Sequence, residues 1–142
     1  QLAADSRRPV RIAALQHPNL PISVLTEMAA DTNSVIRQAV CMNVNTPLNV
    51  LADLATDVDS AVRRLTAQHP NTPLMTLEQL AQDPDPSVIL AVAMHPGADR
   101  SLLTTLAYDD THADVRVAAQ GRLQPLLRRE IRDDILERWD VE

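Results

Sequence analysis

A period of 26 residues runs through most of this 142-residue chain and constrains its fold more than any other feature. Branched apolar residues mark the start of each copy, at Val10, Ile36, Val62 and Val88. Leucines mark the second half of each copy, at Leu25, Leu51, Leu77 and Leu103. A fifth copy begins at Val115, after one inserted residue. Similarity at a fixed period of this length predicts a protein built from stacked repeats.

Within each copy the apolar spacing is helical. Ile36, Ala39 and Val40 stand at positions i, i+3 and i+4, and Leu51, Leu54 and Ala55 repeat that spacing. A proline follows His17, His69 and His95, and a residue before proline disfavours helical geometry, so we expect the first helix to end there. Thr46-Pro47 and Thr72-Pro73 predict a threonine N-cap with proline as the first residue of the second helix.

Neither short helix can bury its apolar stripe alone, whereas stacked neighbours bury it continuously. We therefore predict an all-α fold, an α-solenoid of about five two-helix repeats. The second helices could be short or of the 3₁₀ type. A single domain over 1–142 would comprise a partial repeat at 1–9, repeats at 10–35, 36–61, 62–87, 88–114 and 115–124, and a C-terminal capping helix at 125–142.

The two ends of the chain differ from the repeats. The predicted capping helix carries Leu127, Ile131, Ile135 and Trp139 along one face and charged residues on the other. The chain begins in the middle of a repeat, so we expect an open apolar face there. Such a face predicts an upstream segment, a partner, or self-association.

The copy at 62–87, VRRLTAQHPNTPLMTLEQLAQDPDPS, resembles the leucine-rich repeat variant family and is also similar to HEAT and armadillo repeats. The resemblance covers residues 2 to about 121 and implies a right-handed superhelix of paired short helices. It indicates a fold and no particular activity. Repeat four departs from the pattern at Ile89, Asp99 and Arg100, which predicts a less regular second helix in that repeat.

The composition excludes several kinds of chemistry. All 13 basic residues are arginine, so a lysine-dependent phosphate loop or Schiff base is excluded. Two isolated glycines cannot form a dinucleotide-binding loop. Cys41, the single cysteine, cannot by itself form a disulfide or ligate an iron–sulfur cluster. We therefore expect no cofactor, no metal and no enzymatic activity.

The charge and hydropathy make nucleic acids and membranes poor partners. The formal net charge is −6, and affinity for nucleic acid depends mainly on neutralising phosphates. The longest apolar run, at 88–94, is far shorter than the roughly 20 residues of a membrane span. No secretory leader is recognisable, so we expect a cytoplasmic protein.

Aspartate and arginine recur six residues apart across the turns that join repeats. The predicted ladder consists of Asp5–Arg11, Asp31–Arg37, Asp57–Arg63 and Asp110–Arg116. A row of arginines could bind anions, but we favour a structural role. In that interpretation the carboxylates cap amide groups and the guanidinium groups tie neighbouring turns together.

Other polar residues have similar alternative interpretations. His17, His69 and His95 recur with Asn43 at the repeat spacing, which could suggest a metal site. Residues two repeats apart are too distant to share an ion, so we favour helix-end histidines. Cys41 stands at an apolar packing position and is predicted to be buried. The pairs Asp83/Asp85 and Asp109/Asp110 could act in acid–base chemistry, but we interpret them as turn formers. His112 has no partner visible in the sequence.

The candidate protein-binding patch consists of Met42, Ile89, Leu90 and Met94. These residues come from first-helix positions that the core does not need, and repeat four places large apolar residues there. An exposed apolar patch is typical of a contact surface. The alternative is that repeat four packs slightly rotated and buries these side chains.

We therefore predict a noncatalytic scaffold that presents an extended surface to another protein or peptide. One alternative is a structural segment of a larger protein whose active part lies upstream. The other is an enzyme of the HEAT-like kind that removes alkylated DNA bases. The acidic charge and the scarcity of aromatic residues disfavour that enzyme.

Overall fold

The computed structural model describes residues 8–109 and 111–139, which form helices and connecting turns. The helices are α1 (Arg8–Leu15), α2 (Ile22–Ala29), α3 (Ser34–Met42), α4 (Leu48–Leu54), α5 (Ser60–Gln68), α6 (Leu74–Leu80), α7 (Pro86–Met94), α8 (Arg100–Ala107) and α9 (Ala113–Trp139). This arrangement confirms the predicted all-helical repeat solenoid.

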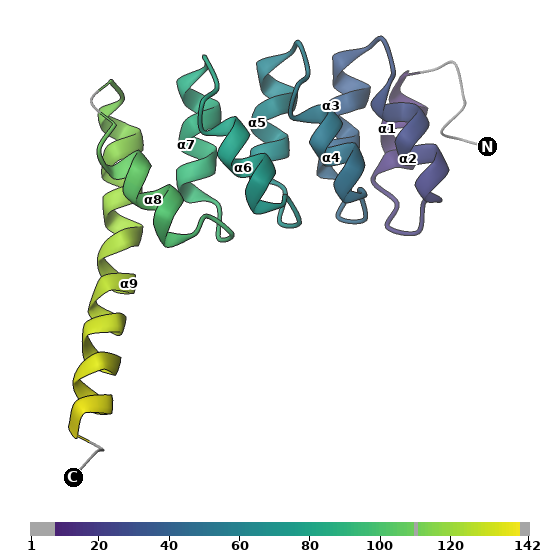
Figure 1. Cartoon of the computed structure of the whole chain (residues 1–142). Coiled ribbons are helices and arrows are strands. Elements are labelled where there is room, and N and C mark those ends of the chain that lie inside the picture. The colour runs from purple at the N-terminus through teal and green to yellow at the C-terminus, as the bar shows by residue number, and fades with distance from the viewer. Residues whose placement is uncertain (1–7, 110, 140–142) are drawn as a thin grey trace.

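The helices form two layers along the stack (Figure 1). The first helices of the repeats, α1, α3, α5 and α7, lie side by side, and each contacts the next. The second helices α2, α4, α6 and α8 cover one side of this layer, each packing against the first helix that follows it. The beginning of α9 takes the place of the next first helix, beside α7 and α8.

The apolar core lies between the two layers. Of the branched residues that mark the starts of the repeats, Ile36, Val62, Val88 and Val115 are fully buried, and Val10 is half-buried. The core comprises two clusters that meet at α5, because Val62 packs with the N-terminal repeats and Ala67 with the C-terminal ones. Small side chains on the first helices allow close packing, and they explain how the stack forms without phenylalanine.

Side-chain caps fix where the first helices begin. Asn33, Asp59 and Asp85 precede α3, α5 and α7, and each accepts a hydrogen bond from the amide two residues later, at 2.9–3.0 Å. The predicted threonine caps of the second helices are wrong. Pro47 and Pro73 hold the N-cap position, while the buried hydroxyls of Thr46 and Thr72 donate back to the carbonyls of Val40 and Thr66. These threonines therefore terminate the preceding helices.

The second helices are α-helices of seven or eight residues rather than 3₁₀ turns. In repeat four, α8 is as regular as its counterparts, although the sequence pattern departs there. The reason is that Asp99, which stands where the other repeats have proline, caps α8 by accepting from the amide of Leu102 at 2.8 Å.

The C-terminal segment differs from the prediction. The fifth repeat at 115–124 and the capping helix at 125–142 are not separate helices, because α9 is continuous through Pro125. Proline removes one hydrogen bond from a helix interior, at the carbonyl four residues earlier. That carbonyl belongs to Gly121, which is exposed, so water can satisfy it. The far half of α9 extends away from the repeats instead of covering them (Figure 1).

Among residues 8–109 and 111–139, no helix combines the length and the apolar character needed to cross a lipid bilayer.

Candidate functional site

The arginines at the start of the first helices form ion pairs within their own repeats. Arg11, Arg37 and Arg63 pair with aspartates 20 residues later, Asp31, Asp57 and Asp83, at 2.5–2.6 Å. The predicted six-residue pairing of side chains is wrong. Arg37 instead donates to the backbone carbonyl of Asp31 at 2.8 Å, and Arg63 donates to that of Asp57 at 2.7 Å. Arg37 and Arg63 therefore each join the turn before their helix to the turn after the repeat.

The geometry of the turns explains this pairing. One carboxylate oxygen of Asp31, Asp57 and Asp83 accepts a hydrogen bond from the amide two residues later, at 2.8–2.9 Å. The other oxygen accepts from the arginine of the preceding first helix, and in Asp57 and Asp83 the first oxygen accepts from that arginine as well. Asp5 and Asp110 lie outside the described residues, so two of the predicted pairs have no structural description. Arg116 donates to the carbonyl of Asp109 at 2.8 Å.

The ion pairs stop at repeat four, where Ile89 stands in the arginine position. Asp109 consequently pairs with its own turn, accepting from the hydroxyl of Thr111 at 2.6 Å and contacting Nδ1 of His112 at 3.0 Å. The hydrogen bond from Thr111, followed by that from His112, holds the pKa of Asp109 well below its ordinary value. His112 therefore has a partner that its sequence position did not reveal.

Asparagine and histidine form a second ladder, at the ends of the first helices. Each side chain donates to a carbonyl of the equivalent turn in the preceding repeat. Asn43 reaches the carbonyl of His17 at 3.2 Å, His69 that of Asn43 at 3.0 Å, and His95 that of His69 at 2.8 Å. The second polar atom of each of these side chains accepts a hydrogen bond from the backbone amide two residues later, as Nδ1 of His69 does from the amide of Asn71 at 3.1 Å. Each rung crosses the interface between two repeats.

Arg122 of α9 adds the final rung, donating to the carbonyls of His95 and Ala93. This role of Arg122 is hidden in the repeat pattern because the inserted residue shifts the fifth repeat. The signal was present, since Arg122 follows His95 by 27 residues, the spacing at which Val115 follows Val88. The histidines are thus engaged in joining repeats. Within the described residues, no group of three or more His, Cys, Asp or Glu side chains is arranged to hold a metal ion.

The predicted contact patch is only partly exposed. Ile89 is 6% exposed and belongs to the core, so its assignment to a surface patch is wrong. Without an arginine at this position, the apolar side chain packs inward. Leu90 is half-buried and also packs against the core. Met42 and Met94 are 63% and 65% exposed, which makes them unusual among the large apolar residues of the first helices.

Met42, Gln68 and Met94 are the last residues of α3, α5 and α7, and all three are exposed. We call these three residues the methionine row. Beside its first two members lies a shallow cavity of about 240 Å³, whose lining includes Val44, Leu65 and Pro70. The row and this cavity form the candidate functional site. It lies at the C-terminal ends of the first helices, where the asparagine and histidine side chains join neighbouring repeats.

Cys41 lies under this site and is 3% exposed. Its sulfur lies 3.4 Å from the hydroxyl of Thr66 and 3.7 Å from the carbonyl of Val62. Burial raises the pKa of the Cys41 thiol to about 11. The thiol therefore remains protonated and unreactive at neutral pH.

We expect Cys41 in the folded chain to react with an aromatic disulfide reagent at pH 8 about a hundredfold or more slowly than in the unfolded chain. Both the small thiolate fraction and burial slow the reaction. The absorbance of the released thiolate measures the rate. The matched control is Gln68→Cys in a Cys41→Ala background, which we expect to react quickly. Equal rates for these two cysteines in the folded state would contradict the conclusion that the Cys41 thiol is buried and unreactive.

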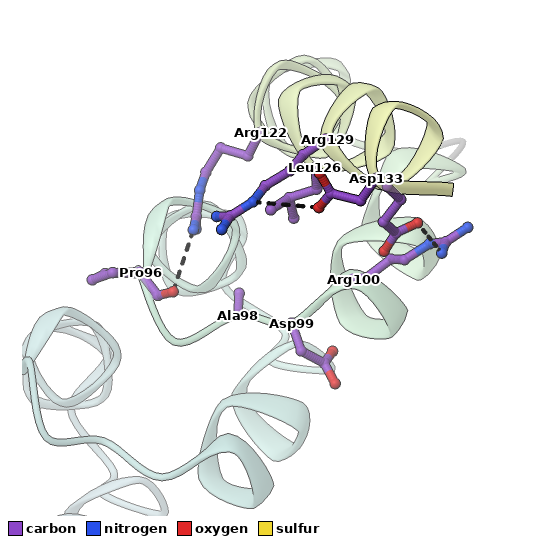
Figure 2. Close-up of a pocket in the computed structure, with 9 residues that line it drawn as sticks. Pro96, Ala98, Asp99, Arg100, Arg122, Leu126, Arg129 and Asp133 are labelled. Atoms are coloured by element: carbon purple, nitrogen blue, oxygen red, sulfur yellow. Dashed lines mark hydrogen bonds and ion pairs between the residues drawn. The ribbon is translucent and has the colours of Figure 1, made fainter. Parts of the chain in front are cut away.

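A second cavity, of about 380 Å³, lies between the start of α8 and α9 (Figure 2). Arg122, Leu126, Arg129 and Asp133 line it from α9, and Pro96, Ala98 and Asp99 line it from the opposite side. Arg100 forms an ion pair with Glu130 at this cavity. These contacts hold the middle of α9 against the last repeat.

Stacked helix pairs joined by two periodic ladders define a helical repeat protein. Residues 61–85, which cover α5 from its second residue and all of α6, match the family model of the leucine rich repeat variant. The match confirms the resemblance of the chain to this family, whose unit is a structural repeat rather than a catalytic domain. Among curated proteins, none matches the chain significantly.

Proposed function

We propose that the chain is a noncatalytic scaffold that binds another protein or peptide along the methionine row. The observation that carries this proposal is the exposure of Met42 and Met94 at the ends of their helices. Hydrogen bonds between neighbouring repeats hold these helices in place. Exposed apolar side chains favour a contact surface, and flexible methionine adapts to a partner's shape.

The two ladders support this proposal because they make the surface rigid. The arginines connect the turns at the start of the first helices, and the histidines connect the turns at their ends. A surface that is ordered before binding loses little conformational entropy when a partner docks. The net charge of −6 also favours a protein partner over nucleic acid.

Selection of a random peptide library on the immobilised chain, followed by calorimetry on the enriched peptides, tests the proposal. We expect the double variant Met42→Glu, Met94→Glu to bind these peptides about tenfold or more weakly, since charge at an apolar contact removes the main anchors. The matched control is Met75→Glu, because Met75 is even more exposed but lies on α6 in the other layer.

Circular dichroism spectra of all variants should be unchanged, because the three methionines are at the surface. Peptides that bind the double variant as tightly as the parent chain would contradict the methionine row as the site. A selection that enriches no binding peptide would contradict the proposal that the chain is a binding scaffold.

A further inference from the structure

The far half of α9 presents apolar side chains that no described part of the chain covers. Leu126 still lines the cavity beside α8, but every side chain described from 128 to 138 is exposed. Ile131 is 61% exposed and Ile135 is 48% exposed, and Leu136 is also exposed. Several turns of helix with exposed isoleucines would be unfavourable in water without a partner.

Three apolar residues share one side of the helix, whereas Leu136 faces another side. Leu127, Ile131 and Ile135 are spaced by four residues, which places them in a stripe along α9. The residues that line the cavity, Leu126, Glu130 and Asp133, lie roughly 130° around the helix axis from this stripe. The stripe is thus available while α9 keeps its contacts with α8.

Charge is segregated along the same segment. Residues 126–132 contain three arginines and one glutamate, giving a net charge of +2. Residues 133–139 contain three acidic residues and one arginine, giving a net charge of −2. The sign changes between Arg132 and Asp133, and Ile131 and Ile135 are symmetrically placed about residue 133. Charge and apolar pattern therefore share one centre.

We propose that this stripe pairs antiparallel with the same stripe of a second copy of the chain. An antiparallel arrangement centred on residue 133 places Ile131 of each copy against Ile135 of the other. It also places each basic half beside an acidic half, whereas a parallel arrangement would align like charges. The symmetry axis of such a pair makes the surface self-complementary.

The ion pairs within α9 do not oppose this pairing, although the register also sets Arg128 opposite Arg138 of the second copy. The ion pairs Arg129–Asp133 and Arg138–Asp134 are exposed and span 4.0 Å and 3.6 Å, so they contribute little and can rearrange. An interface of about four helical turns per copy is small, which predicts a dimer that dissociates on dilution through the micromolar range.

Analytical ultracentrifugation of the chain over a range of concentrations tests the proposal. We expect a monomer–dimer equilibrium, and we expect the double variant Ile131→Arg, Ile135→Arg to stay monomeric at every concentration. The matched control is Ile22→Arg, which changes an equally exposed isoleucine on α2 and should leave the equilibrium unchanged. Thermal unfolding should show that both variants keep the repeats folded.

Disulfide cross-linking distinguishes antiparallel from parallel pairing of the two copies of α9. With the centre at residue 133, the two copies of residue 134 lie about 3 Å apart along the axis, and the two copies of residue 124 about 27 Å apart. In a Cys41→Ala background, Asp134→Cys should therefore form a cross-linked dimer and Gln124→Cys should not. A parallel pair would cross-link at both positions.

Three results would overturn the proposal. The first is a monomer up to the millimolar range, which would assign the stripe to a different partner. The second is a dimer that survives Ile131→Arg, Ile135→Arg, which would place self-association elsewhere, such as at the predicted open N-terminal face. The third is cross-linking at residue 124. None of these results bears on peptide binding at the methionine row, so the two proposals fail independently.

Discussion

Arg37→Ala is expected to lower the free energy of unfolding by about 2–3 kcal/mol at neutral pH, the range for removing one partner of a largely buried charged hydrogen bond. Arg37 donates to both carboxylate oxygens of Asp57, at 2.6 and 2.8 Å, and to the carbonyl of Asp31. In the alanine variant, the largely buried carboxylate of Asp57 loses its cationic partner. Urea unfolding followed by circular dichroism measures the loss.

The loss should depend on pH in a defined direction. Burial disfavours ionisation of Asp57, but the hydrogen bond from Arg37 and that from the amide of Asp59 outweigh it and hold the pKa of Asp57 below its ordinary value. A lowered pKa in the folded state stabilises the fold above the ordinary pKa of about 4 and is lost as the pH falls through the folded value. The difference between parent and Arg37→Ala should therefore shrink toward pH 3.

The matched control is Arg64→Ala, which removes an exposed arginine on the same layer of helices. We expect it to change stability by less than about 0.5 kcal/mol. Equal losses for the two variants, or a loss for Arg37→Ala that is unchanged in acid, would show that the Arg37–Asp57 pair does not stabilise the fold.

His69→Ala is expected to destabilise the chain by about 3 kcal/mol and to reduce the cooperativity of unfolding. His69 is buried, and its removal leaves the carbonyl of Asn43 and the amide of Asn71 without their side-chain partner and opens a cavity. The rung joins repeats two and three, and a repeat protein depends on such nearest-neighbour interfaces. The dependence of the unfolding free energy on urea concentration should therefore become shallower.

The chain supplies the matched substitution for this test. Asn43 occupies the equivalent position one repeat earlier, donating to the carbonyl of His17 and accepting from the amide of Asn45. His69→Asn should therefore recover about half or more of the stability that His69→Ala loses. His17→Ala, at an exposed histidine, should have little effect. If His69→Asn is as unstable as His69→Ala, the hydrogen bonds do not carry the effect.

Local sequence rules predicted the helices and misassigned several side-chain contacts. The 26-residue period and its spacing by three and four predicted which residues are helical and which are buried, as for Ile36 and Val62. The six-residue spacing of Asp31 and Arg37 suggested a side-chain pair, but the carboxylate pairs with an arginine 20 residues away. Thr46 looked like a cap of the following helix and instead caps the preceding one.

The repeat period, and with it the stack of helix pairs, follows from the sequence alone, because periodic apolar side chains can be buried only by neighbours of the same kind. Ladder partners, the inward packing of Ile89 and the extension of α9 through Pro125 depend on tertiary structure. Stacking decides which turns lie adjacent, and a carboxylate or an imidazole bonds to the nearest available group rather than to its neighbour in sequence. Burial of the exposed isoleucines on α9 requires quaternary structure, the contact with a second molecule.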